Sequence, residues 1–191
     1  MNSDLFSNLT TFKKKNNFTL CHCKHFSEKV SALKKLDRTD IKILELLQQD
    51  AKLTHKQIAA QLHLTTTPIY ERIKRLERAG FIRKYTALLD RNLVNLQLMA
   101  FCNVTLKEHQ TDFIHRFERD VRQLPEVVEC YHVAGLYDYL LKVIVPDMQT
   151  YQHFVADKLA ALENIGKVQS SFVMTEIKED TALPLHSLEK T

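Results

Sequence analysis

The stretch from Thr54 to Gly80 carries the pattern that most restricts how this chain can fold. Thr54 and Gln57 are spaced as in a capping box, in which the Thr54 hydroxyl accepts from the Gln57 amide and the Gln57 side chain reaches back. After one short helix, Thr65 offers a second N-cap, and Pro68 then falls in the first turn, where its missing N–H is not needed. Gly80 is well placed to end that helix. The spacing predicts two helices joined by a tight turn.

An additional helix is predicted just before this pair. Apolar residues recur there at helical spacing, and Asp37 or Thr39 is available as the N-cap. The apolar positions are Ile41, Leu44, Leu46 and Leu47. Two helices joined by a short turn, behind a first stabilising helix, form the layout of a winged or simple helix-turn-helix.

The third predicted helix has two chemically different faces. At about 100° per residue, Ile69, Ile73 and Leu76 cluster on one side. The other side carries lysines, arginines and hydroxyl groups, which reach DNA phosphates or base edges. Glu71 also lies there and would repel phosphate, but it can pair with Arg75 at i+4 or accept from a cytosine. The alternative is an amphipathic helix of a bundle, kept soluble by its basic side. The expected DNA-binding residues are Thr54, Lys56, Thr65, Thr66, Thr67, Tyr70, Glu71, Lys74, Arg75 and Arg78.

Charge is divided unevenly along the chain. Residues 1–36 hold seven lysines against two acids, a net charge of +5. Residues 37–86 hold ten basic and six acidic residues, a net charge of +4, whereas residues 87–191 hold ten and fifteen, a net charge of −5. A basic N-terminal half favours a polyanionic partner there, although chance also produces uneven surface charge. Charge thus suggests nucleic acid without establishing it.

The first 36 residues are polar and weakly periodic, and we expect a mobile basic extension. A tight cysteine and histidine cluster lies within it, at Cys21, His22, Cys23 and His25. The usual zinc pattern has wider spacing and a second pair of ligands, so a solvated tail is favoured over a metal site. We expect no resident metal ion and no cofactor.

The second half of the chain alternates between strand-like and helix-like segments. The predicted strands are 98–106, 127–134, 139–145 and 168–177, and the predicted helices are 111–124 and 148–162. The order β-α-β-β-α-β is that of a ferredoxin-like α/β sandwich, an antiparallel sheet with two helices on one face. The fold class is therefore α+β: a helix-turn-helix domain followed by this sandwich.

One face of such a sheet stays bare in a single chain. We expect a partner subunit to cover it, with Phe101, Tyr131 and Phe172 in the contact, and we predict a dimer. The domain division that follows from the whole pattern is an extension (1–36), a helix-turn-helix domain (37–86), a connector (87–95), a sandwich domain (96–180) and a tail (181–191).

Four strings of this sequence carry a resemblance to a known family. They are LDRTDIKILELLQQDAKLTHKQIAAQL at 36–62, TTTPIYERIKRLERAGFIRKYTALLD at 65–90, VVECYHVAGLYDYLLKVIVPDMQTY at 127–151 and FVMTEIK at 172–178. In this order they resemble the Lrp/AsnC (feast/famine) transcriptional regulators over about 37–180. The resemblance implies double-stranded DNA as partner, with 65–79 in the major groove. It also implies dimers formed through the sandwich, which often assemble into octamers.

An amino-acid effector, bound between dimers at the loop joining the second and third strands, is a further implication of the resemblance. The matching residues are Gly135, Leu136, Tyr137 and Asp138, with Thr175 and Ser170 on the last strand as weaker candidates. Gly135 offers an open N–H to a carboxylate, Tyr137 can line the side-chain pocket, and Asp138 can receive an α-ammonium group or fix the loop. Leu136 stands where family members often have an acidic or polar residue. A plain hairpin turn is the alternative.

Other function classes find less support in the sequence. No H-E-x-x-H, G-x-S-x-G or glycine-rich phosphate loop is present, and Cys102 and Cys130 lie in apolar strands as core thiols. We predict a regulator of amino-acid metabolism genes rather than an enzyme. The alternatives are an effector-independent architectural DNA-binding protein and, less favoured, an enzyme resembling the sirohaem decarboxylases, which share this architecture. No apolar run reaches the ~18 residues that span a membrane and no secretory signal is evident, so we expect a cytoplasmic protein.

Overall fold

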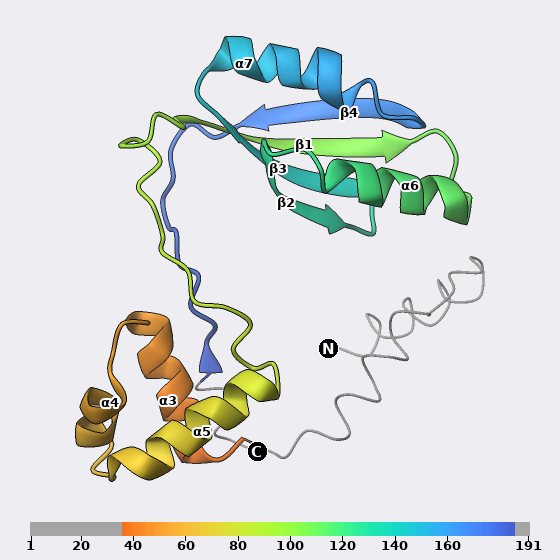
Figure 1. The fold of residues 1–191 in the computed structure, drawn as a ribbon. Coiled ribbons are helices and arrows are strands. Elements are labelled where there is room, and N and C mark those ends of the chain that lie inside the picture. The colour runs from red at the N-terminus through yellow and green to blue at the C-terminus, as the bar shows by residue number, and fades with distance from the viewer. Residues whose placement is uncertain (1–35, 186–191) are drawn as a thin grey trace, which may run out of the picture. The chain divides into compact units, whose positions relative to one another are not determined.

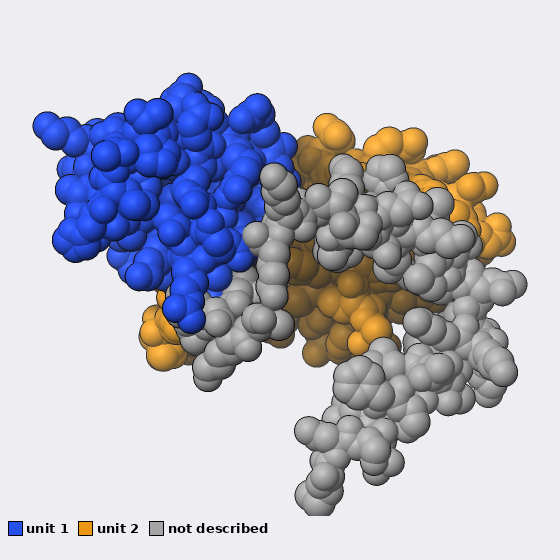
Figure 2. All heavy atoms as spheres, turned by 90° about the horizontal axis from the view of Figure 1, so that it is seen from below, with its two compact units in different colours: residues 1–86, 181–191 blue, residues 87–180 orange. Residues whose placement is uncertain are grey.

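The computed structural model describes residues 36–185, which fall into two compact units. Unit 1 is the described part of Met1–Thr86 and Thr181–Thr191, and unit 2 is Ala87–Asp180 (Figures 1 and 2). Each unit has its own hydrophobic core. The expectations for the N-terminal extension, including a solvated tail rather than a metal site at Cys21, His22, Cys23 and His25, lie outside the described residues.

Three helices form unit 1: α3 (Arg38–Gln49), α4 (His55–Gln61) and α5 (Thr66–Arg78) (Figure 1). Asp37 is the N-cap of α3: the Asp40 N–H donates to the Asp37 carboxylate over 2.8 Å, and the Asp37 N–H donates to the Asp40 carboxylate over 3.2 Å. The core consists of Ile43, Ile58, Ala59, Ile69, Ile73 and Leu76. The predicted three-helix order is confirmed, although Ile43, which is fully buried, was not among the expected core residues of the first helix.

The predicted caps around the turn form, with one exception. The Gln57 N–H donates to Thr54 Oγ1 over 3.3 Å, and the Thr54 N–H donates to Gln57 Oε1 over 2.8 Å. Gly80 ends α5 with φ of +78°, and the amides that follow the helix bond carbonyls of its last turn. Thr65 does precede α5, but its side chain makes no capping bond. The third helical residue is Pro68, which has no N–H to donate.

Unit 2 is a four-stranded antiparallel sheet with helices packed on one face, so the predicted ferredoxin-like order is confirmed (Figure 1). The strands lie in the order β2-β3-β1-β4. The elements are β1 (Leu98–Leu106), α6 (Thr111–Val121), β2 (Val127–His132), β3 (Tyr139–Val145), α7 (Met148–His153), the π-helical segment η1 (Phe154–Leu159) and β4 (Ile165–Phe172).

Side chains alternate across the sheet and define two unlike faces. The helix-covered face carries Ala100, Cys102, Val104, Tyr139, Leu141 and Val143, which pack against Phe117, Val121, Tyr151, Phe154 and Leu159. The opposite face includes Phe101, Tyr131 and Leu140. Phe172 was expected on that open face, but it lies on the helix side with its ring 5.0 Å from that of Tyr151. The expectation was wrong because β4 pairs Phe172 with the core residue Ala100.

Several element ends differ from the sequence prediction. The helix after β1 ends at Val121 and β2 ends at His132, two to three residues early. The second helix changes to π geometry after His153, which places Phe154 and Leu159, five residues apart, both in the core. The last strand starts earlier and ends earlier than predicted. It stops near Phe172, which pairs with Ala100, because its antiparallel partner β1 begins only two residues earlier, at Leu98.

Candidate nucleic-acid interface and effector loop

The front of α5, defined as the side opposite its buried residues, is open to solvent. Ile69, Ile73 and Leu76 fill the back of the helix, where each is at most 3% exposed. Burial of this apolar stripe against α3 and α4 is what orients the helix. The polar residues predicted for DNA contact that are exposed on α5 or at its start are Thr65, Thr66, Thr67, Tyr70, Glu71, Lys74, Arg75 and Arg78.

Two of the predicted residues on α4 are also exposed and are tied to the same region. Thr54 and Lys56 lie in the first turn of α4. His55 between them packs edge-on against the Tyr70 ring, with 5.4 Å between ring centres. This contact joins the start of α4 to the exposed side of α5. The structure thus brings the predicted DNA-facing residues of both helices onto adjoining surfaces.

Lys74 is the centre of a small polar network that the sequence reasoning missed. Its ammonium donates to Glu77 Oε2 over 3.0 Å and lies 5.9 Å from the centre of the Tyr70 ring. The hydrogen bond to Glu77 raises the pKa of Lys74, and the same bond is the main reason that the pKa of Glu77 is lowered. Tyr85 donates to Glu77 Oε1 over 3.1 Å, and burial together with this bond raises the pKa of Tyr85 to about 12. Lys74 is therefore a cation with a carboxylate already beside it.

Arg75 does not stand free on the front of α5. Its Nη2 donates to Asp40 Oδ2 of α3 over 2.5 Å, which makes Asp40 its partner in place of the expected Glu71. Arg72 binds the same carboxylate over 2.8 Å and Asp37 over 2.5 Å. A sequence signal for these ion pairs does exist. Two aspartates stand three residues apart at the start of one helix, and two arginines stand three residues apart on another. Among the described residues, Arg78 has no such acid beside it; its Nε donates to the Lys74 carbonyl over 3.2 Å.

The loop between β2 and β3 holds the predicted effector residues. Leu136 is 91% exposed, and a Cβ on Gly135 would meet open space. Tyr137 donates its hydroxyl to Gln169 Oε1 of β4 over 2.6 Å. Thr175 was expected on the last strand, but it lies beyond the end of β4 and takes no part in the sheet. The structure therefore gathers four of the six candidate residues in one loop and leaves Thr175 outside the strand. Ser170 lies in β4, where its hydroxyl accepts from the Tyr151 hydroxyl over 2.5 Å.

Asp138 is anchored by both of its carboxylate oxygens. The Leu106 N–H at the end of β1 donates to Oδ2 over 2.8 Å, and His109 Nε2 lies 2.9 Å from Oδ1. The Asp138 backbone also donates to the Val104 carbonyl over 3.0 Å and accepts from the Val133 N–H over 2.9 Å. Of the two roles open to this residue in sequence, the geometry supports fixing the loop. His109 was missed because a single histidine in a loop carries no spacing signal.

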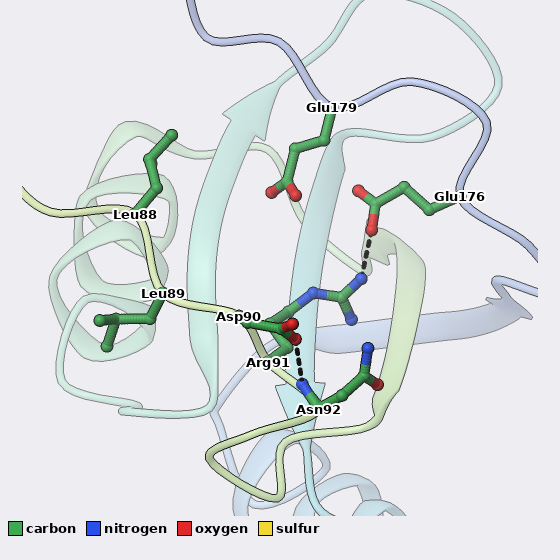
Figure 3. Close-up of a pocket in the computed structure, with 7 residues that line it drawn as sticks. All are labelled: Leu88, Leu89, Asp90, Arg91, Asn92, Glu176 and Glu179. Carbon is green, nitrogen blue, oxygen red and sulfur yellow. Dashed lines mark hydrogen bonds and ion pairs between the residues drawn. The ribbon is translucent and has the colours of Figure 1, made fainter. Parts of the chain in front are cut away.

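A second feature of unit 2 is an open hollow of about 380 Å³, which no predicted site residue lines. Residues 88–92 of the connector form one wall, and Glu176 and Glu179 form the other. Figure 3 shows the Arg91 side chain reaching from the connector to pair with Glu176. Within the described part of the chain, no group of three or more potential metal ligands occurs, and no helix is long and apolar enough to cross a membrane.

Comparison with known proteins covers both units. Residues 36–83 match the model of a winged helix-turn-helix DNA-binding domain, and residues 99–183 match that of the Lrp/AsnC ligand binding domain. The leucine-responsive regulatory protein of Escherichia coli (strain K12) is 38% identical over 150 residues, which are 78% of this chain and 92% of that protein.

Solved structures agree with these matches. A transcriptional regulator from Neisseria meningitidis, in complex with L-Met, is 42% identical with a TM-score of 0.77, covering 80% of this chain and 99% of that one. An AsnC family transcriptional regulator from Agrobacterium tumefaciens is 41% identical with a TM-score of 0.76, at the same coverage. Both units, their order along the chain and the level of identity agree. The chain therefore belongs to the Lrp/AsnC family of transcriptional regulators.

Proposed function

We propose that this DNA-binding regulator, which responds to an amino acid or related metabolite, reads operator DNA with the front of α5 and controls genes of amino-acid metabolism. The observation that carries the proposal is the exposed polar side of α5 above a fully apolar back, in the part of the chain that matches a helix-turn-helix model. Exposed hydroxyls and cations on one helix side suit a mixture of base and phosphate contacts.

The proposed contacts divide by chemistry. Lys56, Lys74 and Arg78 face phosphates, with Thr54 and Thr65 at the two helix starts beside them. Thr66, Thr67, Tyr70 and Glu71 face base edges, where Glu71 can accept from a cytosine amino group. Arg75 stays on the flank, because Asp40 holds it. A dimer presents two such helices to half-sites about 34–36 Å apart.

Salt dependence tests the phosphate contacts. Each contact adds about 0.9 to the slope of log affinity against log salt concentration, so Arg78→Ala is expected to lower that slope by about one. Arg119→Ala is the matched control, since Arg119 is an exposed arginine on α6 of unit 2. An Arg78→Ala slope equal to that of the wild-type chain would remove Arg78 from the interface.

The effector proposal rests on the loop of residues 135–138. The structure from Neisseria meningitidis is a complex with L-Met, and the curated relatives are leucine-responsive, which supports an amino-acid effector here. The effector would bind between dimers and shift the dimer and octamer populations. Light scattering of the chain with each of the twenty amino acids in turn is expected to show a mass change with one or a few. A constant mass with all twenty contradicts this part of the proposal.

One observation favours a second candidate function. Both oxygens of Asp138 are engaged within the chain, so this carboxylate is already occupied where an α-ammonium group would sit. That arrangement suits an effector-independent architectural DNA-binding protein of the same cytoplasmic setting. Such a protein would bind unrelated duplexes with similar affinity and would not respond to any amino acid.

A further inference from the structure

In the described part of the chain, Asp40 is the one charged residue that is buried, with only 1% of it exposed. It lies in the first turn of α3 and is followed by the buried residues Ile41 and Ile43. A buried carboxylate is tolerated only when it is paired and hydrogen-bonded. The partners of Asp40 therefore have to be in place whenever unit 1 is folded.

Both charged partners of its side chain come from α5. Arg75 Nη2 donates to Oδ2 over 2.5 Å, and Arg72 Nη1 donates to Oδ1 over 2.8 Å. Arg72 donates as well to Asp37 over 2.5 Å, and hydrogen bonding to Asp37 is the main reason that its pKa is raised. Two acids of α3 thus face two arginines of α5, with one arginine on each oxygen of the buried carboxylate.

These ion pairs supply something that the apolar core cannot. Ile69, Ile73 and Leu76 decide which side of α5 faces inward, but the hydrophobic effect that drives their burial is not directional and tolerates a small rotation of the helix about its axis. Hydrogen-bonded ion pairs have fixed distances and directions. Because they lie on one flank of α5, they hold the helix at one rotational setting, and with it the exposed side chains of its front.

We propose that Asp40 is a positioning residue for DNA recognition: through Arg75 and Arg72 it fixes the rotation of α5, and so it governs specific binding relative to nonspecific binding. This rests on the proposed function, in which α5 contacts the bases. Base contacts depend on where the side chains point, whereas phosphate contacts depend mainly on charge. Loss of the anchor should therefore lower specific affinity much more than nonspecific affinity.

The experiment uses the full chain and two duplexes of equal length. One is selected by the wild-type chain from a random pool, and the other is an unrelated sequence. Asp40→Asn is expected to weaken binding to the selected duplex about tenfold, the size of one lost base contact, and to change binding to the unrelated duplex by less than about twofold. Glu45→Gln, which removes an acid from the same helix, is the charge-matched control and keeps the wild-type ratio.

Equal losses on the two duplexes would mean that Asp40 only supports folding, and wild-type affinity for both duplexes would mean that it has no role in recognition. Arg75→Gln covers the case in which Asp40→Asn does not fold, because Asp40 then keeps Arg72 and the Asp37 amide. The Arg75→Gln variant is expected to lower the ratio of specific to nonspecific affinity to a similar extent. It should leave the slope of log affinity against log salt concentration unchanged, because the charge of Arg75 is already matched by Asp40. A slope that falls by about one would make Arg75 a phosphate contact and overturn the assignment.

Coupling between the two residues provides the last readout. The double variant Asp40→Asn with Arg75→Gln is expected to lose no more specificity than the worse single variant, because both changes break one contact. Multiplied losses would show that the residues act independently and would contradict the proposal.

A wild-type chain that selects no sequence at all would instead overturn the proposed function together with this inference, while selection with an unchanged Asp40→Asn ratio overturns the inference alone.

Discussion

At the scale of single residues, the most informative side chains are acids that serve the fold of this chain before they serve any ligand. Asp138 holds the end of β1 and the side chain of His109. Asp37 caps α3 and binds Arg72. From the sequence alone, an acid in a loop or at a helix start can bind a ligand, cap a helix or form an ion pair. The partners that surround it in the folded chain show which of these roles it has. Substitution of Asp138 or Asp37 therefore separates its contribution to stability from its contribution to binding.

Asp138→Ala is expected to lower the free energy of unfolding by about 1–2 kcal/mol, because the Leu106 amide and His109 lose their acceptor. DNA binding should survive, since unit 1 is unchanged, but the amino-acid response should be lost with the loop. Urea denaturation and DNA titration with the identified amino acid measure the two effects. Asp157→Ala is the control, because Asp157 forms an exposed pair with His153. Wild-type stability and response in Asp138→Ala would contradict this account.

Asp37 gives a prediction about pH. Burial raises the pKa of Asp37, but hydrogen bonds from Asp40 and Arg72 lower it by more, so the pKa in the folded chain lies below the ordinary value of 3.8. The stabilisation that the charged Asp37 gives to the folded chain is therefore complete above about pH 4. It is lost as the pH falls through the lower pKa that Asp37 has in the folded chain.

Asp37→Asn isolates this charge, because asparagine caps a helix about as well as aspartate. The wild-type chain is expected to be the more stable of the two at pH 6, and the difference should shrink as the pH falls through the lowered pKa of Asp37 and disappear below it. Urea denaturation at several pH values measures it. A difference that persists unchanged into strong acid would show that the contribution is not electrostatic.

At the scale of helices and strands, the sequence predicted the order of the described elements and the type of each except the π-helical segment η1, because the local signals are strong. Thr54 with Gln57 marks one start and Gly80 marks one end, and both behave as expected. The ends of β4 and the π turn at Phe154 were not predictable, because they depend on the register with β1 and on the fit of the core. The same limit applies to Asp40, whose two arginine partners are more than thirty residues away.

Gly80→Ala tests the end of α5. Gly80 has φ of +78°, which costs a residue with a Cβ about 1–2 kcal/mol. We expect unit 1 to lose about that much stability in thermal denaturation. Gly80→Asn should lose less, because asparagine tolerates this conformation better. Equal stability of all three chains would show that the end of α5 rearranges freely.

At the scale of the whole molecule, we propose that two chains act together. A dimer places two copies of α5 on one duplex, and the open face of the sheet is where we expect the copies to meet. Phe101→Asp puts a charge on that face and is expected to give a mass near 22.3 kDa in light scattering, where the wild-type chain gives at least twice that value. Met148→Asp, at an exposed position at the start of α7, should leave the wild-type mass unchanged. A Phe101→Asp chain that keeps the wild-type mass would place the contact elsewhere.

The measurement that tests the central claim most directly is the affinity of the full chain for a duplex it has selected from a random pool, without and with each of the twenty amino acids. An amino-acid-responsive regulator is expected to prefer the selected duplex over an unrelated one by at least about a thousandfold. One or a few amino acids should change that affinity several-fold. Similar affinity for both duplexes and no response to any amino acid would contradict the account and identify the chain as an architectural DNA-binding protein.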